Sequence, residues 1–236
     1  MINVFDPKKQ YISNKKLILR NIKKVLESGN YILGPQVKKL EKNFAKYCGA
    51  KYAIGVKNGT DALILALKSL DIKSGDEVIT TSHTALATIA AIVSTGAKPV
   101  IVDIEDIYFT IDPTKLKSVI NSKTKAIIPV HIYGQVCEMK EIISIAKRNK
   151  IKVIEDCSQA LGAEYNKKKI GTFGDIGTFS FYPTKILGAI GDGGIIITNN
   201  GSIAKKLLEL RQYGWNKKRE TKYPGLNSRL DELQAA

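Results

Sequence analysis

Residues 51–70 read KYAIGVKNGTDALILALKSL, and this stretch predicts a strand, a tight turn and a helix in direct succession. The opening KYAIGV is a short apolar run, as a buried strand requires, and a helix is expected over 62–70. The turn between them presents the amides of Gly59, Thr60 and Asp61 at a helix N-terminus, where free N–H groups and the helix dipole attract anions. An ordinary capped helix with Asp61 in its first turn is the alternative.

The same alternation of strand and helix signals continues along the chain. Short runs rich in valine and isoleucine predict strands buried on both faces, at 51–56, 76–81, 99–104, 125–130 and 152–157. Longer segments predict helices at 62–70, 87–96 and 139–150, and amphipathic helical segments at 14–28 and 38–47. Strands that alternate with helices indicate an α/β fold, in which helices flank a mostly parallel sheet.

The charge of the chain permits two interpretations. The net charge is +15 over 236 residues, and clustered lysine and arginine would favour a nucleic-acid partner. The lysines are instead scattered over helical segments, where they alternate with apolar residues as on solvated faces. No nucleic-acid-binding motif is present, so we expect a lysine-rich surface and no nucleic-acid partner.

Membrane and metal chemistry have little support in the sequence. There is no run of about 18 apolar residues and no apolar signal-peptide core at the start, so we expect no membrane association and a cytoplasmic location. The cysteines are Cys48, Cys137 and Cys157, an odd number without a CxxC pair, and only two histidines are present. We therefore expect neither a disulfide framework nor a metal site.

Several polar residues follow the predicted strands, where ligands of such sheets bind. They are Asn58, His83, His131, Asp156 and Gln159. A single residue of this kind is more often structural, but their shared position favours a site. Asp156 ends an apolar strand, where a carboxylate is costly unless a cation or several donors meet it. A protonated pyridine nitrogen is such a cation, and Gln159 is close enough in sequence to reach the same ligand.

The segment GTFSFYPTKILGAIGDGG, residues 177–194, places Ser180 and Lys185 among aromatic, apolar and glycine residues. A lysine kept from water has a lowered pKa and becomes a nucleophile that can form a Schiff base. The alternative is a lysine that extends its charged end to solvent. The glycines are not a dinucleotide fingerprint, because the strand GIIITN follows them where a helix would be required.

The sequence resembles the DegT/DnrJ/EryC1/StrS family of pyridoxal-phosphate-dependent sugar aminotransferases, which have the fold type I aminotransferase fold. The resemblance covers essentially the whole chain. It rests, in order, on GNYILGPQV, NGTDAL, GDEVITTSHTALAT, TKAIIPVHIYGQ, VIEDCSQALGA, GTFGDIGTFSFYPTK, GDGG and NSRLDELQAA.

The resemblance implies roles for three residues. Lys185 matches the lysine that forms the Schiff base with the cofactor, Asp156 the acid that keeps the pyridine nitrogen protonated, and Gln159 the residue beside the cofactor's 3-hydroxyl. The implied reaction transfers an amino group from an amino acid, with L-glutamate expected, to a keto group of a nucleotide-linked deoxysugar. Related sugar dehydratases carry histidine at the lysine position, so Lys185 argues against that activity.

The resemblance also implies a phosphate site and a dimer. The turn Gly59-Thr60-Asp61 and Ser180 match the residues that hold the cofactor phosphate. Asn227 matches a residue that reaches the phosphate of the neighbouring subunit's cofactor, which implies a homodimer with shared active sites.

Two positions near the site depart from the family pattern. Ile186 follows the lysine where the family often has asparagine, and little is expected to change. Ala85 stands where family members commonly carry an aromatic residue that stacks on the cofactor ring. His83, two residues earlier, is the candidate to take that place.

The third departure is length, since family members usually continue into a small C-terminal domain. Residues 1–236 are therefore expected to be an N-terminal segment plus the large cofactor-binding domain, without the small C-terminal domain. SRLDELQAA predicts a helix opened by a capping box of Ser228 and Asp231, with Leu230 and Leu233 as an exposed apolar stripe. The alternative function is then a non-catalytic remnant that folds and dimerises. For the chain alone we expect weak or no cofactor binding and negligible turnover.

Overall fold

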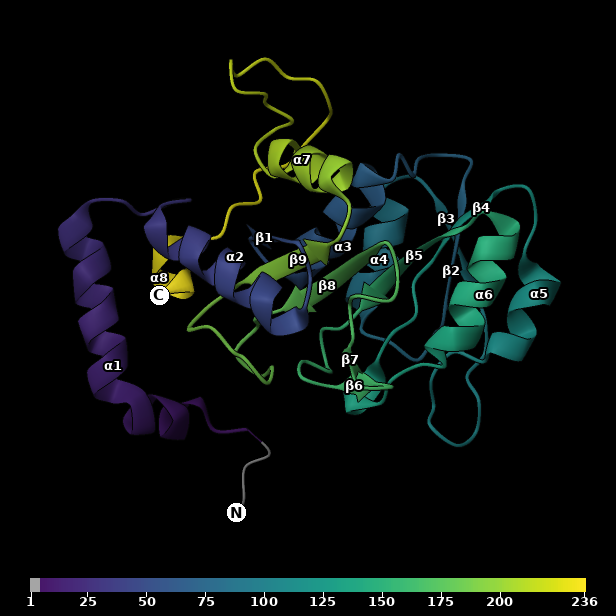
Figure 1. Cartoon of the computed structure of the whole chain (residues 1–236), viewed down its shortest axis with the longest axis horizontal. Coiled ribbons are helices and arrows are strands. Elements are labelled where there is room, and N and C mark those ends of the chain that lie inside the picture. The colour runs from purple at the N-terminus through teal and green to yellow at the C-terminus, as the bar shows by residue number, and fades with distance from the viewer. Residues whose placement is uncertain (1–4) are drawn as a thin grey trace.

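The computed structural model describes residues 5–236 and shows a central sheet with helices on both faces (Figure 1). The α-helices are α1 (Pro7–Ser28), α2 (Pro35–Cys48), α3 (Gly59–Ser69), α4 (Leu86–Ser94), α5 (Leu116–Val119), α6 (Met139–Asn149), α7 (Gly201–Leu210) and α8 (Glu232–Ala235). Two short 3₁₀ turns lie at Pro113–Lys115 and Ile132–Gly134. The helices expected from the apolar periodicity are confirmed, although α1 begins seven residues before the expected segment at 14–28, and α7 was not predicted.

The main sheet has seven strands in the order β1-β9-β8-β5-β4-β2-β3. They are β1 (Tyr52–Val56), β2 (Glu77–Thr80), β3 (Lys98–Ile101), β4 (Thr124–Ile127), β5 (Lys152–Asp156), β8 (Ile176–Ser180) and β9 (Gly194–Thr198). Neighbours from β8 to β3 pair in parallel, whereas β9 is antiparallel to both β8 and β1. The predicted α/β fold with a mostly parallel sheet is confirmed. A separate hairpin pairs β6 (Glu164–Tyr165) with β7 (Lys168–Lys169).

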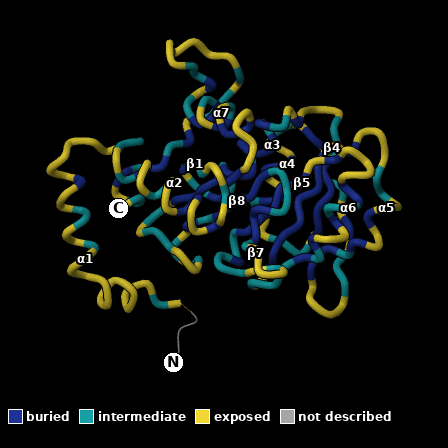
Figure 2. The backbone as a smooth tube through the Cα atoms, in the orientation of Figure 1, coloured by how far each residue is buried: buried dark blue, intermediate teal, exposed yellow. Residues whose placement is uncertain are grey.

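The two faces of the sheet build separate parts of the core, and the buried strands form the centre of the molecule (Figure 2). One face packs against α3, α4 and α7, with residues such as Leu65, Ala91 and Leu207. The other face packs against α5 and α6 towards one end and against α2 towards the other. Successive residues of a strand point to opposite faces of the sheet, so Ile196 of β9 packs in the first part of the core and Ile195 packs against α2 in the other.

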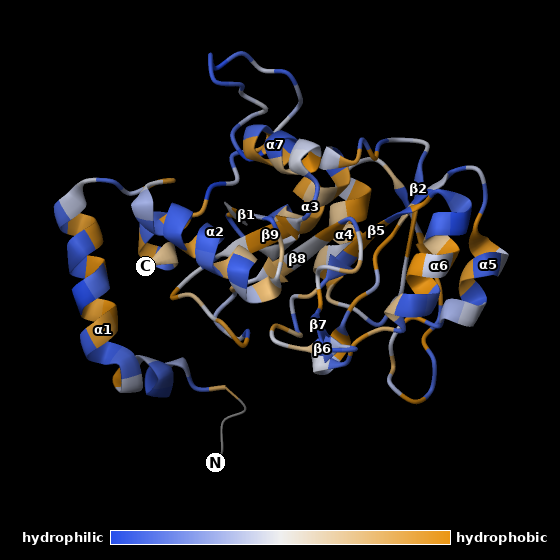
Figure 3. Ribbon diagram, viewed as in Figure 1, coloured by the Kyte–Doolittle hydropathy of each residue, from blue (hydrophilic) through white to orange (hydrophobic). Residues whose placement is uncertain are grey.

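Helix α1 lies at one end of the molecule, away from the sheet (Figure 3). Asp6 caps its N-terminus by accepting the amide of Lys9, and Gly29 ends it in the left-handed conformation with φ of 67°. Val25 is the buried residue of this helix, and its apolar residues alternate with lysines. In residues 5–236, no helix has the length and apolar character needed to cross a membrane.

The last segment of the chain differs from its prediction. Helix α8 begins at Glu232, and its N-cap is Asp231, whose carboxylate accepts the amide of Gln234. The predicted start at Ser228 is wrong, because the Ser228 hydroxyl instead accepts the amide of Lys57 in the turn after β1. The predicted exposed stripe is also wrong in part: Leu230 is 1% exposed, and Leu233 is 37% exposed.

Candidate active site

A pocket of about 300 Å³ opens where the parallel strands end. Its lining includes six of the nine residues predicted to form the cofactor site, namely Gly59, Thr60, Asp156, Gln159, Ser180 and Lys185, and it also includes Asn58 and Ala85. They come from the turn after β1, the ends of β5 and β8, and the loop after β8. Asp61, His83 and Asn227 do not line it. Residues more than 120 positions apart are thus brought together by the sheet order.

The first turn of α3 forms one wall of this pocket. The side chain of Asn58 is the N-cap, and its Oδ1 accepts the amide of Asp61 at 2.8 Å. The expectation that the Asp61 amide is a free donor is therefore wrong. The amides of Gly59 and Thr60 find no acceptor among residues 5–236. Two backbone donors at the positive end of the helix dipole remain for an anion.

Glycine at position 59 is required by a close approach to β8. A Cβ there would lie 2.7 Å from Cβ of Ser180, which is too short for two carbon atoms. Gly194 at the start of β9 meets the same turn, because a Cβ there would lie 2.5 Å from the carbonyl oxygen of Asn58. The missing side chains bring the Ser180 hydroxyl next to the free end of α3.

Asp156 is buried at the end of β5 with 4% of its surface exposed. Its Oδ2 accepts the hydroxyl proton of Thr88 at 3.0 Å, and its Oδ1 accepts the amide of Ser158 at 3.1 Å. The hydroxyl of Thr84, itself part of the pocket lining, lies 2.8 Å from that of Thr88. The sequence prediction missed this pair of threonines. Their spacing of four residues at the start of a helix was the available signal.

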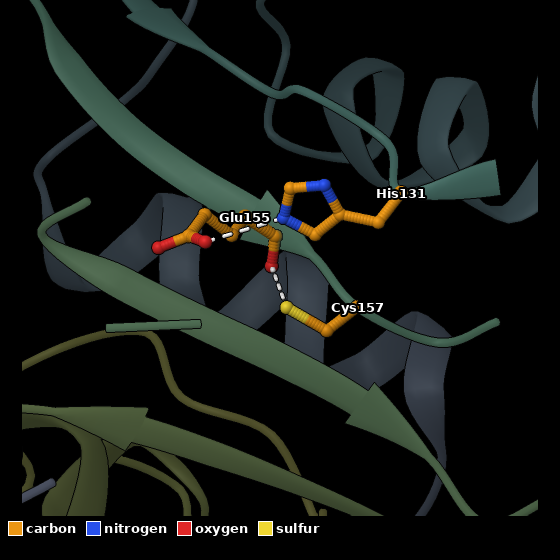
Figure 4. A group of neighbouring side chains, drawn as sticks. All are labelled: His131, Glu155 and Cys157. Atoms are coloured by element: carbon orange, nitrogen blue, oxygen red, sulfur yellow. Dashed lines mark hydrogen bonds and ion pairs between the residues drawn. The ribbon is translucent and has the colours of Figure 1, made fainter. Parts of the chain in front are cut away.

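The residues on either side of Asp156 in the sequence, Glu155 and Cys157, form a buried cluster with His131 (Figure 4). The carboxylate of Glu155 accepts three backbone N–H groups at 2.7–2.8 Å, from Gly171, Phe173 and Gly174. Nε2 of His131 lies 3.2 Å from Oε2 of Glu155. Glu155 therefore connects the end of β5 to the loop 171–174 and to His131 in the segment after β4.

The same cluster has the spacing of a metal site, because one ligand atom from each of the three residues lies within 4.8 Å of the others. Its hydrogen bonds describe another arrangement. The amide of Cys137 donates to Nδ1 of His131 at 3.2 Å, so Nε2 is left to donate to Glu155. Burial raises the pKa of the Cys157 thiol, which keeps it protonated. The cluster is thus a hydrogen-bond network in which both histidine nitrogens are engaged.

Lys185 lies on the loop between β8 and β9 and is half-buried, not fully buried as its apolar neighbours suggested. Its amide donates to the carbonyl of Tyr182 at 2.8 Å. Among residues 5–236, its ammonium group takes part in no ion pair. Tyr182 and Asp192 from the same loop also line the pocket, and the sequence prediction did not include them.

The far rim of the pocket holds Gln159. Its Oε1 accepts the amide of Tyr133 at 3.3 Å, and Tyr133 has the left-handed backbone conformation with φ of 54°. The ring of His83 packs edge-on against the Tyr133 ring at 5.5 Å. His83 is therefore engaged outside the lining, whereas Ala85 lies in it.

Asn227 is exposed and is held by its own segment. Its Oδ1 accepts Nε of Arg229 at 2.9 Å, and it forms an isolated antiparallel bridge with Gln212. It lies outside the lining of this chain's own pocket.

The fold and this pocket belong to a known class of protein. Residues 13–236 match the DegT/DnrJ/EryC1/StrS aminotransferase family. The chain belongs to this family, as the motifs in its sequence suggested.

Individual relatives give the comparison more detail. The chain is 52% identical, over its whole length, to dTDP-3-amino-3,6-dideoxy-alpha-D-galactopyranose transaminase of Aneurinibacillus thermoaerophilus, of which it spans 65%. Among solved structures, DesV of S. venezuelae in complex with a ketimine intermediate has a TM-score of 0.96 and 42% identity, with 99% of this chain and 63% of DesV covered. NtdA of Bacillus subtilis with bound cofactor PMP has a TM-score of 0.90 and 37% identity, with 94% and 51% covered. The chain therefore spans less than two thirds of the length of these relatives.

Proposed function

We propose that this chain is the cofactor-binding part of a pyridoxal-phosphate-dependent aminotransferase. The proposed reaction moves an amino group from an amino acid, with L-glutamate as the expected donor, to a keto group of a nucleotide-linked deoxysugar. The observation that carries this proposal is that Lys185, the buried carboxylate of Asp156 and the free amides of α3 line the same pocket. The named activity of the transaminase relative supports the same reaction class.

The residues of the pocket fit pyridoxal phosphate on chemical grounds. A dianionic phosphate needs donors, and the free amides of Gly59 and Thr60 lie beside the Ser180 hydroxyl. A pyridinium needs a carboxylate, and Asp156 is buried with one hydrogen bond to each oxygen. An aldehyde needs an amine, and Lys185 is unpaired among residues 5–236. PMP in the related NtdA supports the same cofactor class.

Each residue then has a role in the proposed reaction. When bound, pyridoxal phosphate supplies a ring that withdraws electrons from the carbon next to the amino group. The amine of Lys185 would hold the aldehyde carbon and, once released, would take a proton from the substrate carbon. The carboxylate of Asp156 would keep the ring nitrogen protonated, and Gln159 would lie beside the ring hydroxyl. No residue is assigned to stack on the cofactor ring, because Ala85 has no ring and His83 does not line the pocket.

The domain and dimer predictions also enter as proposals. Residues 1–236 are assigned to an N-terminal segment plus the large cofactor-binding domain. A homodimer with shared sites is supported by Asn227, which is exposed and outside its own chain's pocket, as a residue for the neighbouring subunit would be. A cytoplasmic location stays a prediction.

A half-reaction tests the proposed function. The protein is incubated with saturating pyridoxal phosphate and then with L-glutamate, and 2-oxoglutarate is measured. For each cofactor that is bound, we expect one equivalent of 2-oxoglutarate. Because negligible turnover is expected of the chain alone, further release with a keto-sugar nucleotide is expected only from a version extended by the small C-terminal domain. Cofactor bound at Lys185 without any oxo-acid from glutamate or other amino acids would contradict an aminotransferase.

A further inference from the structure

The loop 181–193, which carries Lys185, has little structure of its own. It contains no helix or strand, and it is closed at its base by the amide of Phe181, which donates to the carbonyl of Gly193. Within residues 186–192, only the amides of Ala189 and Ile190 have an acceptor in the described part of the chain. The side chains of Ile186 and Ile190 are each 68% exposed. Such a loop needs support from another segment to hold a side chain in place.

That support comes from residues 230–234, here called the 230–234 segment. Oε1 of Gln234 accepts the amide of Ile190 at 2.9 Å. The amide nitrogen of the same side chain packs on Gly191, where a Cβ would lie 3.4 Å from Nε2. Leu230 packs on Gly193, where a Cβ would lie 3.4 Å from Cδ1. One segment thus contacts the distal half of the loop at three residues, Ile190, Gly191 and Gly193.

The 230–234 segment is itself firmly anchored. Glu232 is 2% exposed, and its two carboxylate oxygens accept the amides of Gln36 and Val37 at 2.8 Å each, at the N-terminus of α2. Its own amide donates to the carbonyl of Tyr31 at 2.9 Å. Two charge-assisted hydrogen bonds at the positive end of a helix make a strong attachment. The contact between Gln234 and Ile190 therefore connects the loop to a rigid part of the fold.

We propose that Gln234 is a positioning residue for Lys185: through the amide of Ile190 it fixes the loop that carries the lysine. The importance of this for the reaction rests on the proposed function, in which the Lys185 amine holds the cofactor. The loop order itself is a property of the chain and can be measured without cofactor.

Amide hydrogen exchange by NMR on the ¹⁵N-labelled protein tests this role. In Gln234→Leu, which keeps the volume but removes the acceptor, we expect the amides of Ile190 and Lys185 to exchange at least tenfold faster. Gln234→Glu keeps an acceptor oxygen and should restore exchange to near the parent rate. Leu233→Gln, on the exposed side of the same helix, is the matched control and should leave both amides unchanged.

The outcomes separate the two proposals. Unchanged exchange of the Lys185 amide in Gln234→Leu would overturn the positioning role, whether or not the Ile190 amide is affected. If the leucine variant does not fold, Gln234→Glu becomes the test. Faster exchange of the Ile190 and Lys185 amides in Gln234→Glu, which retains the acceptor oxygen, would also overturn the positioning role. A pyridoxal phosphate adduct on a lysine other than Lys185 would contradict the proposed function, while the exchange result would still report on the loop.

Discussion

Thr88 donates its hydroxyl proton to Oδ2 of Asp156 across 3.0 Å, and both residues are buried. The bond joins the first turns of α4 to the end of β5, so the carboxylate is fixed from two elements. The Ser158 amide holds the other oxygen. Asp156 is therefore positioned by its surroundings before any ligand binds.

We predict that Thr88→Val destabilises the protein by about 1–3 kcal/mol, because the carboxylate would lose a buried donor without a change in side-chain size. Urea denaturation measures the free energy of unfolding. Thr84→Val is the control: it keeps the bond between Thr88 and Asp156 and should cost less. Equal costs for the two variants would contradict the importance of this bond.

Asp156→Asn should keep the shape of the site but lose the charge that holds the ring nitrogen protonated. We expect retained binding of pyridoxal phosphate and a half-reaction with glutamate slower by a factor on the order of 10²–10³. Stopped-flow absorbance gives the rate, and equilibrium titration gives the affinity. A variant as fast as the parent would show that Asp156 has no such role.

Glu155→Gln should destabilise the fold by about 3 kcal/mol. The carboxylate accepts three amides and lies against His131, and a glutamine NH₂ group would face donors in place of an acceptor. The control is Glu164→Gln, whose partner Lys169 lies on the surface, for which a change of about 0–1 kcal/mol is expected. Denaturation midpoints would decide, and a similar small change in both variants would argue against the buried network.

Gly59→Ala should cost about 1–3 kcal/mol, because the new methyl group would overlap Cβ of Ser180. Removing that Cβ in the double variant Gly59→Ala/Ser180→Gly should recover much of the loss. A double-mutant cycle of unfolding free energies measures the coupling. Additive effects of the two substitutions would contradict the close approach.

The sequence predicts six of the seven strands of the main sheet, because buried strands and amphipathic helices have distinct periods. It does not single out β8 (Ile176–Ser180), which lies between β5 and β9. It does not predict the direction of β9. The run GIIIT is buried on both faces, and such a run has the same pattern in either direction. The antiparallel pairing follows from the loop 181–193, which returns the chain to the edge of the sheet where β8 ended.

The candidate site is predicted only in part for a related reason. Asp156 and Lys185 stand out because a charged residue follows or interrupts an apolar segment. The role of Thr88 depends on contact with a residue 68 positions away, which local patterns do not contain. The burial of Leu230 depends on Gly55 and Gly193, whose missing side chains leave space for it. The Asp61 amide is not free because Asn58 caps the helix, which is the alternative that the sequence leaves open. The residue types alone do not decide between a capped turn and a turn with three free amides.

Lys185 is the residue that we propose to bind the cofactor covalently. Borohydride reduction of the protein with saturating pyridoxal phosphate, followed by peptide mass mapping, tests this proposal most directly. We predict that the label falls on Lys185 alone, that it is lost in Lys185→Ala, and that it is unchanged in the surface variant Lys205→Ala. In the half-reaction, Lys185→Ala should also be slower by a factor on the order of 10²–10⁴, since the same amine moves the proton. A stoichiometric label on any other lysine, or a full label in Lys185→Ala, would contradict the account.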